Sequence, residues 1–444
     1  MLLGRSFVKP KSILIISYYF PPSNMVAALR VYSFAKYLAE YGHRITVLCC
    51  QQSAGEEESD LDFDCSSFSV QPVVYGAAGG RNIDYYYQQS IKSDHVLNRF
   101  FWKSKDSLIR LLARVKNWLF GNLFTPEDFW GLSAWRRAKL LLEKDTFDIV
   151  VTSSGPISCH FIGYGLKKNH RVPWIADYRD PWLKNPNWPN PVRAVSWLQS
   201  KIQMTLNDST DFLITVSDQL SKDFFAGYAS KVCIIENGYF PEDVSNAFPS
   251  PADAFLITYT GTFYGTSYKC DQFFEGVRQA AKHMEMERNI QIRFFGCNTD
   301  IIRSTAEKYS LGNLVTVHPK ISRQESLAAQ RNSDVLIFFS SSDPLYGGFY
   351  SSKIFEYIIS GTPIIVVGNL ESNAAANLVR NSGTGFVCGN DSEKVFEALM
   401  RIYHGDLPVR NEELIESFRR DRLALRLVDL VEQLVQVPKR HDQN

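Results

Sequence analysis

The chain has 444 residues, of which 45% are hydrophobic and 21% are charged, and its formal net charge is +1 at pH 7. This composition is typical of a folded globular protein and excludes a disordered or fibrous chain. The length exceeds the roughly 250–300 residues at which one hydrophobic core stops growing, so we expect two domains. A net charge close to zero gives no general attraction to nucleic acid, and we expect no nucleic-acid partner.

The eight cysteines are scattered along the sequence, without a Cys-x-x-Cys pair or the spacing of metal ligands. This pattern favours free thiols in a reducing cytoplasm over a disulfide framework or a zinc site. No run approaches 18 consecutive apolar residues, so the sequence predicts no membrane-spanning helix.

The first 50 residues predict one β-α-β unit. Residues 12–17 (SILIIS) are continuously apolar, as in a strand that is buried on both faces. The apolar run is too short for a signal peptide and leads directly into two prolines. Residues 25–41 have helical spacing, and residues 44–50 (RITVLCC) form the next strand.

The same alternation of apolar strands and helices continues along the chain. Further strands are expected at 147–153, 172–176, 211–217 and 232–237. After a stretch rich in Pro, Ser and Ala, strand-like segments resume as FLITYTG, IQIRFFG, LVTVHP, DVLIFFS, TPIIVVG and TGFVCG. This order predicts an α/β protein with two doubly wound parallel sheets, each covered by helices on both faces.

We expect the two domains at residues 1–240 and 241–410. A last long helix, 411–436, has no strand after it, and the sequence permits it to pack back on the first domain. Residues 98–118 interrupt the alternation and contain six basic residues and one acidic residue among aromatic side chains. Such a segment is typical of a membrane-surface contact, and equally of a packed helix with a solvated basic face.

In open α/β sheets, ligands bind beyond the carboxyl ends of the strands. In the second half, the strand 334–339 is followed by a loop and a helix that place Ser351, Ser352 and Lys353 at this edge, suited to a diphosphate. Glu356, one turn further, is suited to the two hydroxyls of a ribose. The alternative is a simple ion pair between Lys353 and Glu356 on one helix face. An ion pair does not explain their place at the ligand edge, so we favour nucleotide binding.

Two other loops follow strands of the second half. The segment 260–265 (TGTFYG) contains Gly261 and Thr262, and Lys269 follows shortly after. A glycine there lets the backbone approach a phosphate closely. The segment 318–322 (HPKIS) is suited to reading the edge of a base, or is an ordinary loop with a helix cap.

The first half carries three loops at the corresponding edge: SYYFPPSN, SSGP at 153–156, and ADYRDPW at 176–182. The candidate residues in or near them are Ser23, Asn24, His160, Asp177, Arg179 and Asp180. Carboxylates and a guanidinium between aromatic rings suit a sugar or its reacting centre. The alternatives are an internally paired Asp–Arg–Asp loop and a structural role for the histidine.

The chain resembles a GT-B glycosyltransferase of the family 4-like type, the kind that acts in bacterial surface-polysaccharide assembly. The resemblance covers nearly the whole length and rests on segments in the family's order: SYYFPPSNMVAALRVYSFAKYLAEYGH, SSGPISCHF, PWIADYRDPW, ENGYFPED, YTGTFYG and SSKIFEYIISGTPI. It implies two Rossmann-like domains that face a cleft. It places a nucleotide-sugar donor, UDP-linked, on the second domain and a saccharide or lipid-linked saccharide acceptor on the first.

The resemblance also implies a hexosyltransferase that retains anomeric configuration and needs no cofactor and no metal. Lys353 and Lys269 would take the charge of the departing diphosphate, while Asp177 or Asp180 would position the acceptor or take its proton. The enzyme would work in the cytoplasm, at the inner face of the cell membrane if residues 98–118 contact lipid. Two alternatives share the architecture: a UDP-sugar epimerase and an inactive GT-B scaffold.

The sequence departs from the family at two positions. Members often carry Glu-x7-Glu, whose second glutamate matches Glu356, but Gly348 stands where the first would be. The first loop has Asn24 and Met25 where many relatives have paired glycines. The identity of the donor sugar and the approach of this loop to the phosphates therefore stay open.

Overall fold

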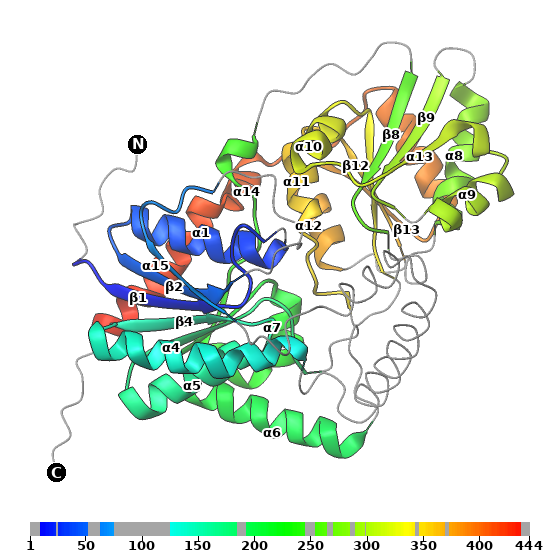
Figure 1. Cartoon of the computed structure of the whole chain (residues 1–444). Helices are drawn as coiled ribbons and strands as arrows, with labels where there is room; N and C mark the ends of the chain where they lie inside the picture. Colours follow the sequence, from blue (N-terminus) through cyan, green and yellow to red (C-terminus); the bar gives the residue numbers. More distant parts are fainter. Residues whose placement is uncertain are drawn as a thin grey trace, which may run out of the picture. The chain divides into compact units, whose positions relative to one another are not determined.

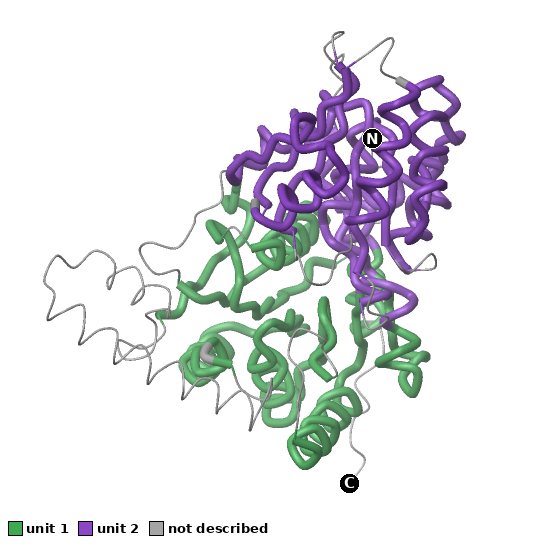
Figure 2. The backbone as a smooth tube through the Cα atoms, turned by 90° about the vertical axis from the view of Figure 1, so that its right-hand side faces the viewer, with its two compact units in different colours: residues 1–215, 221–234, 426–444 green, residues 216–220, 235–425 purple. Residues whose placement is uncertain are grey.

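The computed structural model describes residues 9–23, 25–51, 63–74, 125–183, 192–244, 254–263, 270–284, 289–297, 299–341, 346–368 and 373–436. The chain divides into two compact units, shown in Figure 2. The first unit comprises residues 1–215, 221–234 and 426–444, and the second comprises residues 216–220 and 235–425.

The first unit is built on a seven-stranded sheet with the order β3-β2-β1-β4-β5-β6-β7, in which all neighbours are parallel. Its strands are β1 (Ser12–Ser17), β2 (Arg44–Cys50), β3 (Ser69–Val73), β4 (Ile149–Ser153), β5 (Trp174–Tyr178), β6 (Phe212–Thr215) and β7 (Val232–Ile234). Every residue of β1, β4 and β5 is buried, which explains why these strands are continuous apolar runs.

Helices cover both faces of this sheet. They are α1 (Val26–Glu40), α4 (Trp130–Lys144), α5 (Ser158–His170), α6 (Arg193–Ser209), α7 (Asp218–Phe225) and α15 (Arg420–Gln436), with the 3-10 turns η1 (Pro126–Phe129) and η2 (Ala226–Lys231). Figure 1 shows α4, α5 and α6 together on one face, with α1 on the opposite face. The core on the α4–α6 side contains Trp130, Ile162 and Trp174, which pack beneath Leu14 and Ile16 of β1.

The second unit is built on a six-stranded parallel sheet with the order β10-β9-β8-β11-β12-β13. Its strands are β8 (Ala254–Thr260), β9 (Asn289–Phe295), β10 (Val315–His318), β11 (Val335–Phe339), β12 (Ile364–Val367) and β13 (Gly385–Gly389). Its helices are α8 (Asp271–Met284), α9 (Thr299–Lys308), α10 (Arg323–Arg331), α11 (Lys353–Ile359), α12 (Ala374–Ser382), α13 (Ser392–Tyr403) and α14 (Glu412–Ser417), with the 3-10 turns η3 (Pro241–Asp243) and η4 (Gly312–Leu314).

The side chains of β11 show why this sheet is doubly wound. Ile337 and Phe339 belong to the core beneath α8 and α13, whereas Leu336 and Phe338 belong to the core beneath α11 and α12. Because successive side chains of a strand point to opposite faces, an uninterrupted apolar strand supplies both cores. The predicted α/β class with two doubly wound parallel sheets is thus confirmed.

The expected single helix at 411–436 is wrong, because the structure breaks it into α14 and α15. The backbone N–H of Tyr239 donates to the carbonyl of Phe418, and the N–H of Arg420 donates to the carbonyl of Tyr239. These bonds to a distant segment replace helical ones at the break, and Phe418 is buried beside Phe355. Within the part of the chain that the structure describes, no helix is long and apolar enough to cross a membrane.

Candidate active site

Gly261 and Lys353 lie together at the carboxyl edge of the second sheet. Gly261 follows β8 with a φ of +100°, a conformation that favours glycine, and its N–H donates to the carbonyl of Phe295 at 2.9 Å. A Cβ on residue 261 would lie 2.9 Å from Lys353 Cε and 3.1 Å from Lys353 Nζ. The glycine therefore leaves the space that the lysine side chain uses, and it brings the ammonium group against backbone.

The Lys353 ammonium is held by an aromatic side chain. Its Nζ donates to the Tyr259 hydroxyl at 2.8 Å and lies 4.0 Å from the centroid of the Tyr259 ring. The same hydroxyl donates to the carbonyl of Thr262 at 2.8 Å, so the lysine and the loop after β8 share one partner. Burial lowers the pKa of Lys353 to about 8, because the charged amine has lost much of its water.

Glu356 has an ionic partner other than Lys353. Its Oε1 lies 3.3 Å from Nε of Arg323, and its Oε2 accepts a long hydrogen bond of 3.4 Å from Gln330. Arg323 also forms a bidentate pair with Asp243, with N–O distances of 2.7 and 2.6 Å. Burial raises the pKa of Glu356, and the guanidinium opposes this effect. The α11 charges thus have separate partners, which disfavours the simple pair that we considered for them.

Ser351 and Ser352 lie just before α11. The carbonyl of Ser351 accepts from the N–H of Ile354, and the carbonyl of Ser352 accepts from the N–H of Phe355, both at 3.1 Å. Ser351 is exposed and Ser352 is half-buried. Both serines therefore stand at the edge of the sheet where the sequence places them, and their contact with a diphosphate stays a prediction.

The position of the family's first glutamate has no room for a side chain. A Cβ on Gly348 would lie 2.8 Å from Leu220 Cγ and 3.0 Å from the Leu220 nitrogen. The Gly348 carbonyl also accepts a hydrogen bond of 2.6 Å from the Ser217 hydroxyl. The departure from Glu-x7-Glu is therefore built into the packing of this unit.

Two polar residues near the end of β11 escaped the sequence analysis. Asn373 donates through its amide to the Ser340 hydroxyl, and its Oδ1 accepts from the N–H of Ala376 at 2.7 Å. Both side chains are buried. The signal for Asn373 was available, because an asparagine before the run AAANLV is a typical helix N-cap.

In the first unit, Asp177 forms a buried pair with Arg30. The guanidinium donates to both carboxylate oxygens, with Nε–Oδ2 at 3.0 Å and Nη2–Oδ1 at 2.7 Å, and Ser153 donates to Oδ2 at 2.7 Å. The side chains of Arg30 and Asp177 are 1% and 0% exposed. Because the carboxylate is enclosed, Asp177 holds the end of β5 and does not face solvent in this conformation. Arg30 was missed, although an arginine on the apolar face of helix 25–41 was a signal.

His160 is also enclosed. Its Nδ1 lies 2.7 Å from the Thr152 hydroxyl, which accepts from the Trp174 indole at 2.8 Å, and its ring centroid lies 4.2 Å from that of Tyr178. Burial lowers the pKa of His160 to about 3, so the imidazole is neutral at physiological pH. This environment agrees with the structural alternative for His160 rather than with direct contact to a substrate.

Arg179 and Asp180 are the accessible residues of the ADYRDPW loop. Arg179 Nε donates to Asp180 Oδ2 at 2.8 Å, and the two side chains are 18% and 41% exposed. Arg179 Nη2 lies 3.6 Å from where a Cβ on Gly155 would be, so this guanidinium stands beside the SSGP loop. The internally paired Asp–Arg–Asp loop is therefore found only in part: Arg179 pairs with Asp180, whereas Asp177 pairs with Arg30.

The remaining predictions concern residues at the ends of other loops. Ser23 is buried, and its hydroxyl accepts a long bond of 3.4 Å from the N–H of Met25. Asn24, Lys269 and segment 98–118 lie outside the described residues. Among the residues that are described, no cluster of three His, Cys, Asp or Glu side chains is arranged to hold a metal ion.

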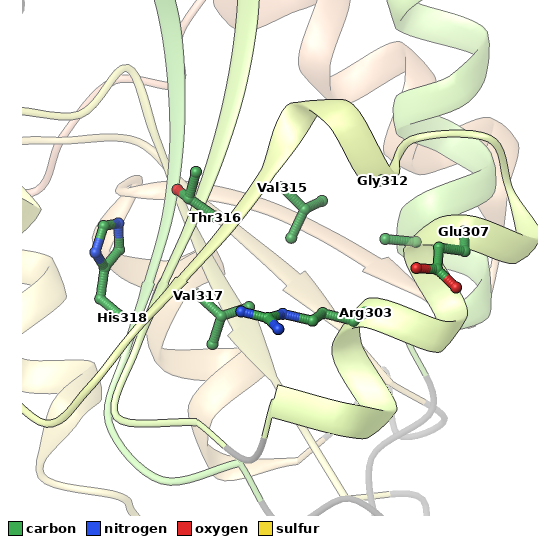
Figure 3. Close-up of a pocket in the computed structure, with 8 residues that line it drawn as sticks. Arg303, Glu307, Gly312, Val315, Thr316, Val317 and His318 are labelled. Carbon is green, nitrogen blue, oxygen red and sulfur yellow. The ribbon is translucent and has the colours of Figure 1, made fainter.

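A separate cavity of about 390 Å³ lies beside the edge strand β10 (Figure 3). Its lining comes from α9, η4 and β10 and includes Arg303, Glu307, Thr316 and His318. It shares no lining residue with the Gly261–Lys353 site. His318 is the first residue of segment 318–322, whose backbone we considered for base recognition, and its ring stacks on Phe295 with a centroid distance of 4.6 Å.

Known proteins similar to this chain agree with its architecture. Residues 27–243 match Glycosyltransferase Family 4. Sucrose-phosphate synthase from Thermosynechococcus elongatus is similar over 96% of this chain and 99% of its own, with a TM-score of 0.61 and 14% identity. The apo form of the lipopolysaccharide outer core galactosyltransferase WaaB is similar over 95% of this chain and 99% of its own, with a TM-score of 0.57 and 10% identity.

A protein from Listeria monocytogenes that is assigned as a UDP-N-acetylglucosamine 2-epimerase covers 96% of both chains, with a TM-score of 0.51 and 10% identity. No curated protein matches the sequence. These low identities show the fold alone, and the family match adds the class of enzyme. The chain is a glycosyltransferase with the GT-B fold, and its residues 27–243 match the model of Glycosyltransferase Family 4.

Proposed function

We propose that this enzyme transfers a hexose from a UDP-linked sugar to a saccharide or lipid-linked saccharide, with retention of anomeric configuration, in the synthesis of a surface polysaccharide or glycan. The observation that carries the proposal is the Lys353 ammonium group held against the backbone of Gly261 at the ligand edge of the second sheet. A partly desolvated ammonium group beside backbone without a side chain suits a diphosphate. The negative charge of the diphosphate would stabilise the charged amine, which has lost its stabilisation by water on burial.

Lys353 would stabilise the negative charge that develops on the departing diphosphate. The loop after β8 would approach the same group through backbone, because Gly261 carries no side chain there. Glu356 would accept hydrogen bonds from the ribose hydroxyls while Arg323 fixes its carboxylate. Lys269, Ser351 and Ser352 are further candidates for the phosphates.

On the acceptor side, we assign direct roles to Arg179 and Asp180, whose side chains are accessible at the end of β5. Asp180 would position the acceptor hydroxyl or take its proton, and Arg179 orients this carboxylate at 2.8 Å. Asp177 and Arg30 would act indirectly by holding the strand end from which this loop leaves. In a retaining transfer the departing phosphate can also serve as the base, so the role of Asp180 needs its own test.

The likeness to a protein assigned as an epimerase supports one second candidate, a UDP-sugar epimerase. A screen of UDP-sugars in the absence of any acceptor separates the two. Slow release of UDP with free sugar favours the transferase, whereas conversion of one UDP-sugar into another without release of UDP favours the epimerase. Failure to bind any nucleotide in calorimetry would favour an inactive scaffold instead.

The proposal includes no cofactor, no metal and no nucleic-acid partner, and it places the enzyme in the cytoplasm at the inner face of the cell membrane. Transfer that persists in excess EDTA supports the metal-free reaction. Transfer that is lost in EDTA and recovered with a divalent cation contradicts it.

A further inference from the structure

Exposed apolar side chains gather on one helical layer of the first unit. Twelve large hydrophobic residues are exposed among those that the structure describes, and half of them belong to η1–α4 and α6. These six are Phe129, Leu132, Leu140, Trp197, Leu198 and Met204. Figure 1 shows α4, α5 and α6 side by side on the same face of the sheet, and α5 packs against both neighbours. We call the outward side of this layer the α4–α6 surface.

Helix α6 separates its two faces sharply. Trp197, which is 63% exposed, lies one turn from Lys201 and two turns from Met204, so these side chains share the outward face. On the inward face, Gln203 and Leu206 are buried. Exposed apolar side chains that gather on one face of a protein often mark a surface that binds another molecule.

Helix α4 repeats the pattern. Its inward residues Ala134 and Ala138 are buried beneath the sheet, whereas Leu132 is 67% exposed. The exposed Arg136 lies one turn after Leu132, and the exposed Leu140 lies one turn after Arg136. Both outer helices of the layer therefore present apolar and basic side chains to the same side of the unit.

The charge of this layer differs from that of the whole chain. Helices α4, α5 and α6 together contain eight Lys and Arg residues and two Asp and Glu residues. The turn η1 adds Glu127 and Asp128, and Asp128 accepts from the N–H of Ser158. The complete chain carries a formal net charge of only +1. A basic surface with exposed aromatic and aliphatic side chains has the chemistry of a contact with anionic lipid.

We propose that the α4–α6 surface docks on an anionic lipid bilayer. Trp197, Leu198 and Met204 enter the boundary between headgroups and acyl chains, where tryptophan is favoured, and Arg193 and Lys201 lie among the headgroups. The basic residues of α4 and α5 add long-range attraction to the negative surface. This docking does not depend on which sugar the enzyme transfers.

The inward face of α6 connects this surface to the acceptor loop. Gln199 Nε2 donates to the carbonyl of Trp182 at 2.8 Å, and Gln203 Oε1 accepts from the N–H of Leu183 at 3.2 Å. Trp182 and Leu183 follow Arg179 and Asp180 in the chain, with only Pro181 between Asp180 and Trp182. A helix with its side chains is about 10–12 Å across, so docking would hold the acceptor loop within about that distance of the bilayer. A lipid-linked acceptor would then meet the loop without leaving the membrane.

Vesicle binding of the full chain tests the proposal, using phosphatidylcholine with and without phosphatidylglycerol. The double variant Trp197→Ser/Met204→Ser should bind mixed vesicles at least about tenfold more weakly, because it loses the free energy gained when two large apolar side chains leave water. Arg193→Gln and Lys201→Gln should each cost about fivefold on mixed vesicles, and nothing on pure phosphatidylcholine. Val409→Ser, which removes a 92% exposed side chain of the second unit, and Arg303→Gln are the matched controls and should bind like wild type.

Equal binding by the wild type and the Trp197→Ser/Met204→Ser variant, or no binding by the wild type, would overturn the proposal. So would loss of binding only in Arg110→Gln/Arg114→Gln/Lys116→Gln, which would assign the contact to residues 98–118. Sedimentation velocity tests whether a second copy of the chain binds this surface instead. A wild-type dimer that becomes a monomer in the double variant would make this surface an interface between copies. Circular dichroism and UDP binding verify that each variant is folded.

Discussion

Gly348 packs directly against Leu220, so that any Cβ at position 348 would lie within 2.8 Å of the leucine side chain. This contact stands at the position of the first glutamate of Glu-x7-Glu, the motif that members of the resembled family often carry. The donor sugar must therefore be held without that carboxylate. Ser340 and Asn373, which are joined by a hydrogen bond beyond β11, are polar groups of the same sheet edge.

Restoring the family's glutamate should damage the protein. We expect Gly348→Glu to lower the free energy of unfolding by about 1–3 kcal/mol, the usual cost of forcing extra atoms into a packed site. Gly227→Ala, where no atom lies within 4 Å of the added Cβ, is the control. Urea denaturation measures both. A Gly348→Glu variant with wild-type stability and faster transfer would show that the site accepts the carboxylate.

The affinity for UDP should fall as the pH rises through about 8. Burial lowers the pKa of Lys353 to about 8 in the free enzyme, so the amine is mostly charged at pH 7 and mostly neutral at pH 9. A diphosphate favours the charged amine and raises its pKa, so binding takes up a proton above pH 8. Calorimetry between pH 7 and pH 9 should show up to a tenfold loss of affinity for UDP.

Two controls isolate the lysine. Lys353→Met should bind UDP weakly at every pH and lose the dependence on pH, and wild type should bind uridine, which has no phosphate, without this dependence. If the affinity of Lys353→Met for UDP still falls between pH 7 and pH 9, the titrating group is a residue other than Lys353.

Glu356→Ala should weaken binding of UDP by about 1.5–3 kcal/mol, the range for hydrogen bonds to a charged group. The loss should be smaller for 2′-deoxy-UDP, because that ligand lacks one of the proposed partners. Calorimetry with both ligands gives the coupling energy. Equal losses for the two nucleotides would remove the ribose assignment and leave Glu356 as the partner of Arg323 alone.

Asp180→Asn should reduce the rate of transfer at least about 100-fold, the lower range for a positioned acid–base group, and change UDP affinity by only a factor of a few. Lys353→Ala should reduce both, because a charge partner of the diphosphate acts before and during the reaction. Rates with a short soluble acceptor and calorimetric affinities check the pair. Retained turnover with lost UDP affinity in Asp180→Asn would reverse the assignment of donor and acceptor sides.

Breaking the pair between Arg30 and Asp177 should be costly. Arg30→Met leaves a carboxylate buried without its cation, and we expect a loss of about 3–5 kcal/mol in the free energy of unfolding. Arg278→Met removes the half-exposed pair with Glu275 and should cost no more than about 1 kcal/mol. In urea denaturation, Arg30→Met/Asp177→Leu should lose less than the sum of its single variants. Additive losses would mean that the two residues stabilise the fold independently.

The sequence predicts most of the fold because the information is local. Runs such as SILIIS and DVLIFF are apolar throughout, and only strands buried on both faces need that pattern. Strand β3 escaped prediction because SVQPV is short, includes the polar residues Ser69 and Gln71, and contains a proline, all of which the edge of a sheet tolerates. The break between α14 and α15 escaped because it depends on Tyr239, far away in the sequence.

The candidate site is predictable only in part. Lys353 and Glu356 stand on one short helix whose place at the ligand edge follows from the order of strands. Their partners do not follow, because Tyr259 lies 94 positions before Lys353. Arg30 and Asp177 are 147 positions apart, and nothing in either local stretch indicates that they pair.

The division of the chain has a consequence for how the protein is made. The first unit takes residues 426–444 from beyond the second unit, and Arg426 donates to the carbonyl of Ile234 at 2.8 Å, in the last strand of the first sheet. During synthesis on the ribosome, the earlier unit must therefore wait for its final helix until the whole of the later unit has emerged. A fragment that stops at residue 240 would lack this final helix, so its first unit would stay as incomplete as it is during synthesis.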